Sequence, residues 1–119
     1  MRYKEFEVYK RAYRLSLEVH KSSLTFPKYE QYALADQLRR ASKSIALNIA
    51  EGYGKSGSAA EFKRYLLISL GSCNETLVIL DYCKDLGYMS PTDCELYHNE
   101  YNVLSKMVYS LHKSWRDLR

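Results

Sequence analysis

The chain has 119 residues and a mass of 13.9 kDa, with 46% hydrophobic residues, 27% charged residues and a net charge of +4. These values fit one globular domain over residues 1–119 and exclude an intrinsically disordered chain. The longest nearly apolar run, residues 65–70, is far shorter than the roughly 20 residues of a membrane span, and no signal-peptide core follows Met1. We therefore expect a soluble, cytoplasmic protein.

The first two predicted helices cover residues 6–24 and 34–52. Five Gly and two Pro leave little material for turns, which favours a few long helices over many short strands. Pro27 separates the two segments, and Gly52 is expected to end the second. Apolar residues recur at helical spacing on one face of each segment: Val8, Ala12, Leu15 and Val19, then Leu34, Leu38, Ala41, Ile45 and Ile49.

Two further helices are predicted over residues 59–86 and 91–115. Ser58 and Glu61 form a capping-box pattern at the start of the third helix, and Gly87 is suited to end it. Their expected core residues are Phe62, Leu66, Ser69, Cys73, Leu77 and Leu80, then Leu96, Val103, Met107 and Leu111. Because the connections are short, we predict an all-α, up-down-up-down antiparallel four-helix bundle.

Several helices carry a second apolar stripe beside the expected core stripe. It comprises Phe6, Tyr13, Leu17 and Leu24, then Tyr65, Ile68, Ser72 and Ile79, and finally Tyr97, Tyr101, Val108 and Trp115. So much apolar surface on a monomer would favour aggregation, so the pattern favours a homo-oligomer. The alternative is that these residues cover the core edges of a monomer, since tyrosines tolerate partial burial.

A polar stripe on the second helix continues onto the start of the third. Its members are Gln37, Arg40, Ser44, Asn48 and Glu51, followed by Glu61 and Arg64. We interpret them as a structural polar network that fixes helix register or a subunit contact. A binding or catalytic pocket is the alternative.

Two short motifs suggest ligand sites that we do not favour. Residues 52–57 match G-x-G-x-x-G, but they join two helices and do not follow a strand, as a dinucleotide site requires. Lys55, Ser56, Ser58 and Lys63 would instead allow a phosphate to bind at the start of the third helix. Glu95 and His98 form one Glu-x-x-His pair, whereas a di-iron bundle needs two. We expect no metal site and no cofactor.

The cysteines and histidines indicate no catalytic centre. Cys73, Cys83 and Cys94 are too widely spaced for a zinc motif and are expected to be buried free thiols. Arg14 and His20 have a spacing similar to the R-x4-6-H element of the helical ribonucleases known as HEPN domains. However, Leu15 follows Arg14, where that motif usually has a polar residue. We therefore expect a non-enzymatic protein. A ribonuclease that uses Arg14 and His20 is the least favoured alternative.

Positive charge is concentrated in the first half of the chain. Residues 1–64 contain 13 Lys and Arg against 7 Asp and Glu, whereas residues 65–119 contain 5 against 7. Five cations are predicted on the outer faces of the first two helices: Lys10, Arg14, Lys21, Arg39 and Lys43. They form our candidate nucleic-acid interface, which would contact backbone phosphates without reading bases. A solvated helix face is the alternative.

Segments along nearly the whole chain resemble the four-helix bundle proteins encoded by intervening sequences of bacterial 23S ribosomal RNA genes. The most specific segment is Ser44-Ile45 with residues 48–52. The others are Phe26-Pro27 with Glu30, Leu34, residues 37–41, Glu61-Phe62, residues 64–66, Gly71-Ser72, Glu75 and residues 86–88.

The resemblance implies a ring-like homopentamer with no established enzymatic activity. A related group of pentamers acts as accessory factors to the reverse transcriptases of diversity-generating retroelements and contacts nucleic acid through a basic surface. We therefore expect structured RNA as the partner of this chain, with no membrane involved. A protein scaffold that binds no nucleic acid is the main alternative.

Overall fold

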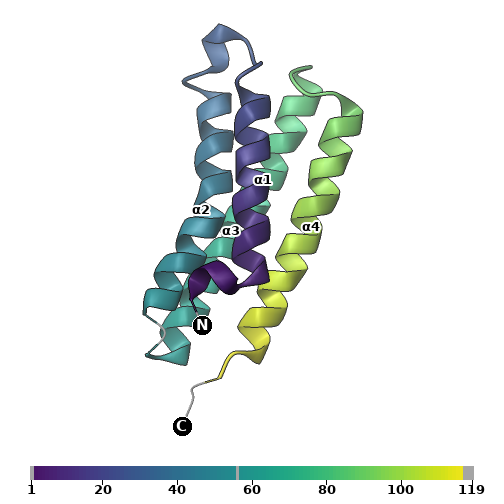
Figure 1. Cartoon of the computed structure of the whole chain (residues 1–119). Helices are drawn as coiled ribbons and strands as arrows, with labels where there is room; N and C mark the ends of the chain where they lie inside the picture. The colour runs from purple at the N-terminus through teal and green to yellow at the C-terminus, as the bar shows by residue number, and fades with distance from the viewer. Residues whose placement is uncertain (1, 56, 117–119) are drawn as a thin grey trace.

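The computed structural model describes residues 2–55 and 57–116, and these residues form helices and connecting turns but no strand (Figure 1). The all-α prediction is therefore confirmed for this part of the chain. The long helices are α1 (Glu7–Ser23), α2 (Leu34–Gly54), α3 (Ala59–Asp85) and α4 (Pro91–Ser114). Two short 3-10 helices, η1 (Tyr3–Glu5) and η2 (Lys28–Glu30), precede α1 and α2.

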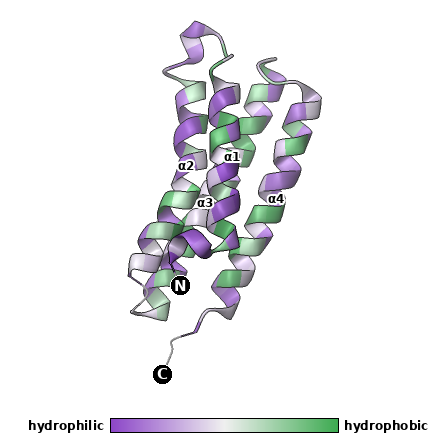
Figure 2. Ribbon diagram, in the orientation of Figure 1, coloured by the Kyte–Doolittle hydropathy of each residue, from purple (hydrophilic) through white to green (hydrophobic). Residues whose placement is uncertain are grey.

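The four long helices lie side by side in one elongated body (Figure 1) of 52 × 24 × 20 Å. Each helix packs against the next one in the chain, and α4 also packs against α1. Hydrophobic and hydrophilic stretches follow each other along the ribbons of α1 and α4 (Figure 2), as expected for helices with one apolar face and one polar face.

The predicted core stripes of the first three helices are confirmed. Residues spaced three or four apart on each helix lie on one face, and this face turns toward the neighbouring helices. The buried members are Val8, Ala12, Leu15 and Val19, then Leu38, Ala41, Ile45 and Ile49, and then Phe62, Leu66, Ser69, Cys73 and Leu80.

The predicted core face of α4 was wrong at Leu96 and Val103, whereas Met107 and Leu111 are partly buried and pack against the core. Leu96 and Val103 are exposed, and the buried residues of this helix are Cys94, Tyr101, Leu104 and Val108. The buried face starts at Cys94, whose thiol donates to the Leu80 carbonyl oxygen on α3 at 3.4 Å. This helix carries two apolar stripes, and the buried face includes Tyr101 and Val108 of the second one, because periodicity alone does not show which stripe faces the other helices.

The second apolar stripe divides into buried and exposed residues. Phe6, Tyr65, Ser72, Ile79, Tyr101 and Val108 are buried within the single chain. Tyr13, Leu17, Leu24 and Ile68 are exposed, and Leu47, Leu67, Val78 and Tyr82 join them as exposed apolar side chains on α2 and α3. Exposed apolar surface therefore remains on α1, α2 and α3, and on α4 it lies at Leu96, Val103 and Tyr109 instead of at the predicted residues.

The predicted caps set the ends of α3 and α4. The Ser58 hydroxyl accepts from the Glu61 N–H at 3.4 Å, and the Ser90 hydroxyl accepts from the Asp93 N–H at 3.1 Å. Gly87 has φ +81°, a left-handed conformation suited to the end of α3. The Glu61 carboxylate accepts from Arg64 at 3.0 Å, so it is not the second arm of a capping box.

Gly52 lies inside α2 and does not end it, contrary to our expectation. A Cβ at this position would lie 2.4 Å from the Tyr65 Cβ and 3.1 Å from Phe62 Cδ1. Glycine therefore allows the backbone of α2 to approach α3 closely.

Helix α3 is more apolar than its longest apolar run suggests. By length and composition alone it would be able to cross a membrane. In this structure it packs against both α2 and α4. Core helices of folded domains have the same composition.

The three cysteines are free and buried, as predicted. Burial raises the pKa of Cys73 to about 11 and that of Cys83 to about 12. These two thiols therefore stay protonated at neutral pH and pack as small apolar side chains.

Candidate nucleic-acid interface

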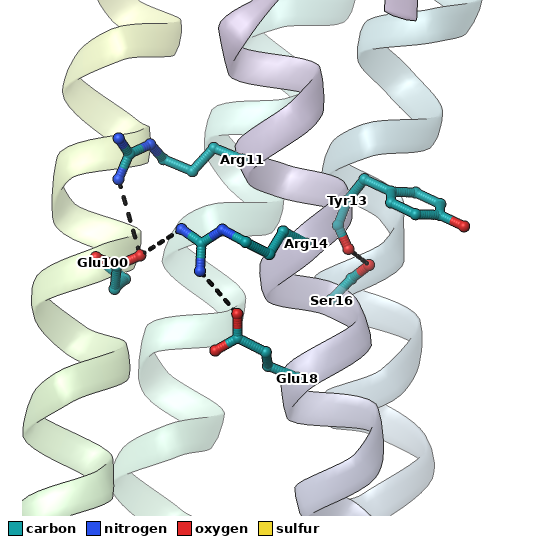
Figure 3. Close-up of polar contacts among 6 residues, drawn as sticks. All are labelled: Arg11, Tyr13, Arg14, Ser16, Glu18 and Glu100. Carbon is teal, nitrogen blue, oxygen red and sulfur yellow. Dashed lines mark hydrogen bonds and ion pairs between the residues drawn. The ribbon is translucent and has the colours of Figure 1, made fainter.

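Arg14 is held in an ion-pair cluster between α1 and α4. Its two terminal nitrogens donate to Glu18 and to Glu100, each at 2.7 Å, and Arg11 lies 3.8 Å from the same Glu100 oxygen (Figure 3). The hydrogen bond to Glu100, followed by that to Glu18, raises the pKa of Arg14. Two guanidinium groups face two carboxylates, so the cluster carries no net charge.

Lys10 also has an acidic neighbour. Its ammonium lies 3.5 Å from the Glu7 carboxylate one turn earlier on α1. Ion pairs as exposed as this one contribute at most about 1 kcal/mol and exchange readily with other charged groups. A phosphate that contacts Lys10 or Arg14 would therefore compete with carboxylates that are already in place.

Arg39 anchors the connection between α1 and α2. Its guanidinium donates to the Ser23 hydroxyl at 2.8 Å, to the Gln31 side-chain oxygen at 3.2 Å and to the Gln31 carbonyl oxygen at 2.6 Å. Gln31 in turn donates to the carbonyl oxygens of Ser23 and Phe26. Arg39 is thus half-buried and holds the loop in place, a role that helical spacing did not reveal.

Lys21 and Lys43 are the two predicted cations that the described residues engage in neither an ion pair nor a side-chain hydrogen bond, whereas Arg39 has only neutral acceptors. Both are exposed, and neither forms an ion pair within residues 2–55 and 57–116. The imidazole of His20 lies in the positive field near them, since burial and then the charges of Lys43 and Arg39 lower its pKa. The end of the body where α1 meets α2 is therefore electropositive.

The structure does not bring Arg14 and His20 together. Arg14 reaches across to Glu100 on α4, whereas His20 lies near Lys43 and Arg39 on α2. A phosphate contacted by one side chain would lie on a different face from the other. The geometry therefore gives no support to the ribonuclease alternative.

A tyrosine-lined groove runs beside Lys43 between α1 and α2. The rings of Tyr3 and Tyr9 are 5.0 Å apart and those of Tyr9 and Tyr13 are 5.9 Å apart. The groove has a volume of about 390 Å³, and Leu17, Leu47 and two alanines also line it. The sequence did not place these rings next to a cation, so this juxtaposition is an addition from the structure.

The predicted polar set separates into local groups. Asn48 donates to the Ser44 carbonyl and hydroxyl oxygens at 2.8 and 3.0 Å, and Ser44 shares a 2.8 Å hydrogen bond with Ser72 of α3. Arg40 pairs with Asp36 at 3.7 Å and Arg64 with Glu61 at 3.0 Å, while Gln37 and Glu51 are exposed. Ser44 thus bonds across to α3, and Asn48 bonds to Ser44 within α2, while the structural role of the others stays a prediction.

The glycine-rich segment, residues 52–57, begins within α2 and follows no strand among the described residues, so it is not a dinucleotide site of the strand–loop–helix type. Ser56, part of the phosphate alternative, lies outside the described residues. The Lys55 ammonium lies over the Tyr65 ring, 5.5 Å from its centre. That interaction occupies the cation expected to contact a phosphate there.

These features define a small all-helical protein. It has an ion-paired flank, formed by Arg11, Arg14, Glu18 and Glu100 between α1 and α4, an electropositive end at Lys21 and Lys43, and exposed apolar side chains. The chain belongs to the 23S rRNA-intervening sequence protein family, whose sequence model matches residues 4–110. The resemblance found in the sequence is therefore confirmed.

Among solved structures, the chain is similar to the crystal structure of a protein of unknown function from the S23 ribosomal protein family of Bacteroides thetaiotaomicron. The two share 20% sequence identity with a TM-score of 0.80, over 90% of this chain and 96% of the other. At this identity the likeness supports the fold alone. No curated protein matches this chain significantly.

Proposed function

We propose that this chain is a non-enzymatic, cytoplasmic protein that assembles into a homo-oligomer and binds structured RNA through backbone phosphates. In this proposal each chain is an up-down-up-down antiparallel bundle, and five copies form the assembly. The contact surface is the electropositive end, with Lys21 and Lys43 as the principal cations. Arg39 adds to the field around them, and Lys10 and Arg14 take part only where a phosphate displaces their carboxylate partners.

The electropositive end is the observation that carries the proposal. Lys21 and Lys43 have no carboxylate to displace, so a phosphate gains their full attraction without first breaking an ion pair. Lys10 and Arg14 would have to give up Glu7, Glu18 or Glu100. Burial and then the positive charges of Lys43 and Arg39 lower the pKa of His20, which is consistent with positive charge on this part of α2.

Exposed apolar side chains support the oligomer. Leu47, Leu67 and Val78 are each at least half exposed, and Tyr13 and Tyr82 add aromatic surface on α1 and α3. A second copy of the chain is the occupant we propose for this surface, because burying it removes a source of aggregation. Repetition around a ring would also multiply the two free lysines of each chain, which strengthens the attraction for a polyanion.

We choose RNA as the nucleic acid because the family is named for intervening sequences of 23S rRNA. The groove beside Lys43 favours a second candidate function, a scaffold for a protein partner, because tyrosine and leucine side chains dominate its lining. The two candidates differ in whether affinity depends on Lys21 and Lys43.

Charge reversal of the free lysines tests the proposal. The double variant Lys21→Glu and Lys43→Glu is expected to bind an RNA hairpin at least about 10-fold more weakly and to lower the salt slope by about 2, one unit per lost phosphate contact. Fluorescence anisotropy across a salt series measures both quantities.

Lys106→Glu with Lys113→Glu on α4 is the matched control, because it changes the net charge by the same amount on another helix. This control is expected to bind RNA with a nearly unchanged salt slope. Equal losses in the two double variants would mean that net charge alone attracts RNA, and the proposed contact surface would be wrong.

A further inference from the structure

Three side chains of metal-ligand type meet where α3 and α4 pack together. Asp81 comes from α3, and Cys94 and His98 lie four residues apart on one face of α4. Their ligand atoms all lie within 4.8 Å of one another, and His98 Nε2 is 2.8 Å from Asp81 Oδ1. Residues from two helices thus converge on a single point.

The cluster opens to solvent through a pocket of about 400 Å³. The pocket is lined by the three ligand-type residues together with Lys84, Pro91 and Glu95. Cys94 is only 2% exposed, whereas Asp81 is exposed and His98 is half-buried. An ion from solvent would therefore reach the carboxylate and imidazole first and the sulfur last.

Thiolate, imidazole and carboxylate together are donors typical of zinc sites. Zinc bonds of about 2.0–2.3 Å in a tetrahedron place neighbouring ligand atoms roughly 3.3–3.8 Å apart. The ligand atoms lie up to 4.8 Å apart, so the widest separation would have to close by about 1 Å, while the Asp81–His98 hydrogen bond would have to open by about 0.5 Å. Both of these side chains have solvent beside them and are free to make that movement.

We propose that Asp81, Cys94 and His98 bind one Zn²⁺ ion per chain, with water as the fourth ligand. On binding, the Cys94 thiol releases its proton to solvent and gives up its hydrogen bond to Leu80. The Asp81–His98 hydrogen bond opens, and the Nε2 proton of His98 is exchanged through solvent for one on Nδ1, so that the neutral imidazole binds the ion through Nε2. The carboxylate and thiolate charges then balance the charge of the ion.

This site is independent of the proposed RNA contact, which lies on α1 and α2. Sequence reasoning missed it because it tested His98 only with Glu95, in a motif that needs a second Glu-x-x-His pair. The third ligand, Asp81, lies on a different helix and belongs to no local motif. Only the packing of α3 on α4 brings it to His98.

Metal titration of the full-length protein, first stripped with a chelator, tests the proposal. We expect one Zn²⁺ per chain in competition with a chromophoric chelator at micromolar concentration. Co²⁺ as a spectroscopic substitute is expected to give a near-ultraviolet thiolate charge-transfer band. Cys94→Ser is expected to abolish that band and to weaken zinc binding at least about 100-fold. Loss of a residue that only hydrogen-bonds to a ligand typically weakens metal binding by about 10- to 100-fold, so the loss of a direct ligand should be at least as large.

Asp81→Asn and His98→Gln provide tests at solvent-accessible positions and are each expected to weaken zinc binding at least about 10-fold. Cys73→Ser and His112→Gln, which change the same residue types elsewhere, are expected to retain both the affinity and the band. The proposal is overturned if the wild-type protein takes up no zinc at micromolar concentration. It is also overturned if the charge-transfer band survives Cys94→Ser.

Discussion

Replacing Phe62 with alanine is expected to destabilise the fold by about 3–5 kcal/mol, the usual cost of emptying a large core position. Phe62 is fully buried at the start of α3. Its ring centre lies 4.7 Å from that of Trp115, 5.9 Å from that of Phe6 and 6.0 Å from that of Tyr53. The substitution therefore removes the ring that joins the residue before α1, the end of α2 and the residue after α4.

Urea unfolding at one fixed protein concentration measures this loss and keeps any contribution from assembly constant. Phe62→Leu retains most of the volume and is expected to cost less than about 1.5 kcal/mol. Tyr32→Ala, at a ring that is 96% exposed, should change stability by no more than about 0.5 kcal/mol. A loss below about 1 kcal/mol for Phe62→Ala would mean that the aromatic cluster does not hold these segments together.

Gly52→Ala is expected to destabilise the protein by about 1–3 kcal/mol, even though alanine favours a helix over glycine by up to about 1 kcal/mol. The new methyl group would lie 2.4 Å from the Tyr65 Cβ, an atom fixed to the backbone of α3. A side-chain rotation cannot relieve that overlap, so α2 and α3 must move apart.

Gly71→Ala is the matched control within α3, since a Cβ there meets no atom within 4 Å. This variant is expected to gain about 0.5–1 kcal/mol from helix propensity alone. Thermal unfolding of the two variants should therefore shift the midpoint in opposite directions. Equal stabilisation by both substitutions would contradict the close approach of α2 and α3 at Gly52.

Local patterns in the sequence predicted most of the fold. The spacing of Val8, Ala12, Leu15 and Val19 fixes one face of α1, and the hydroxyl caps at Ser58 and Ser90 fix helix starts, because each involves residues within one or two turns. The four helices and most of their core residues follow from such contacts.

The features that the sequence did not reveal depend on contacts between residues that lie far apart in the chain. Arg14 is neutralised by Glu100, which is 86 residues away, and Arg39 is held by Ser23 and Gln31 at a loop. Gly52 follows the same rule, since only the position of Tyr65 shows why a glycine is needed inside α2. Helical spacing places a residue on a face but does not identify the side chain opposite.

For the candidate interface, these contacts reduce five predicted cations to two that are free to attract a phosphate, Lys21 and Lys43. The ion-paired flank at Arg14 and Glu100 contributes to the contact between α1 and α4. The tyrosines along the neighbouring groove place aromatic surface next to Lys43. Aromatic rings beside cations suit unpaired bases as well as phosphates, so RNA with loops is the ligand we would test.

The most direct test of this account is the salt dependence of binding to an RNA hairpin and to a matched DNA duplex, with the mass of the assembly measured in the same samples. We expect an oligomer that prefers RNA and whose affinity falls steeply between about 50 and 200 mM salt. An intact oligomer that binds neither nucleic acid at low salt would contradict the account and leave the protein scaffold as the leading function.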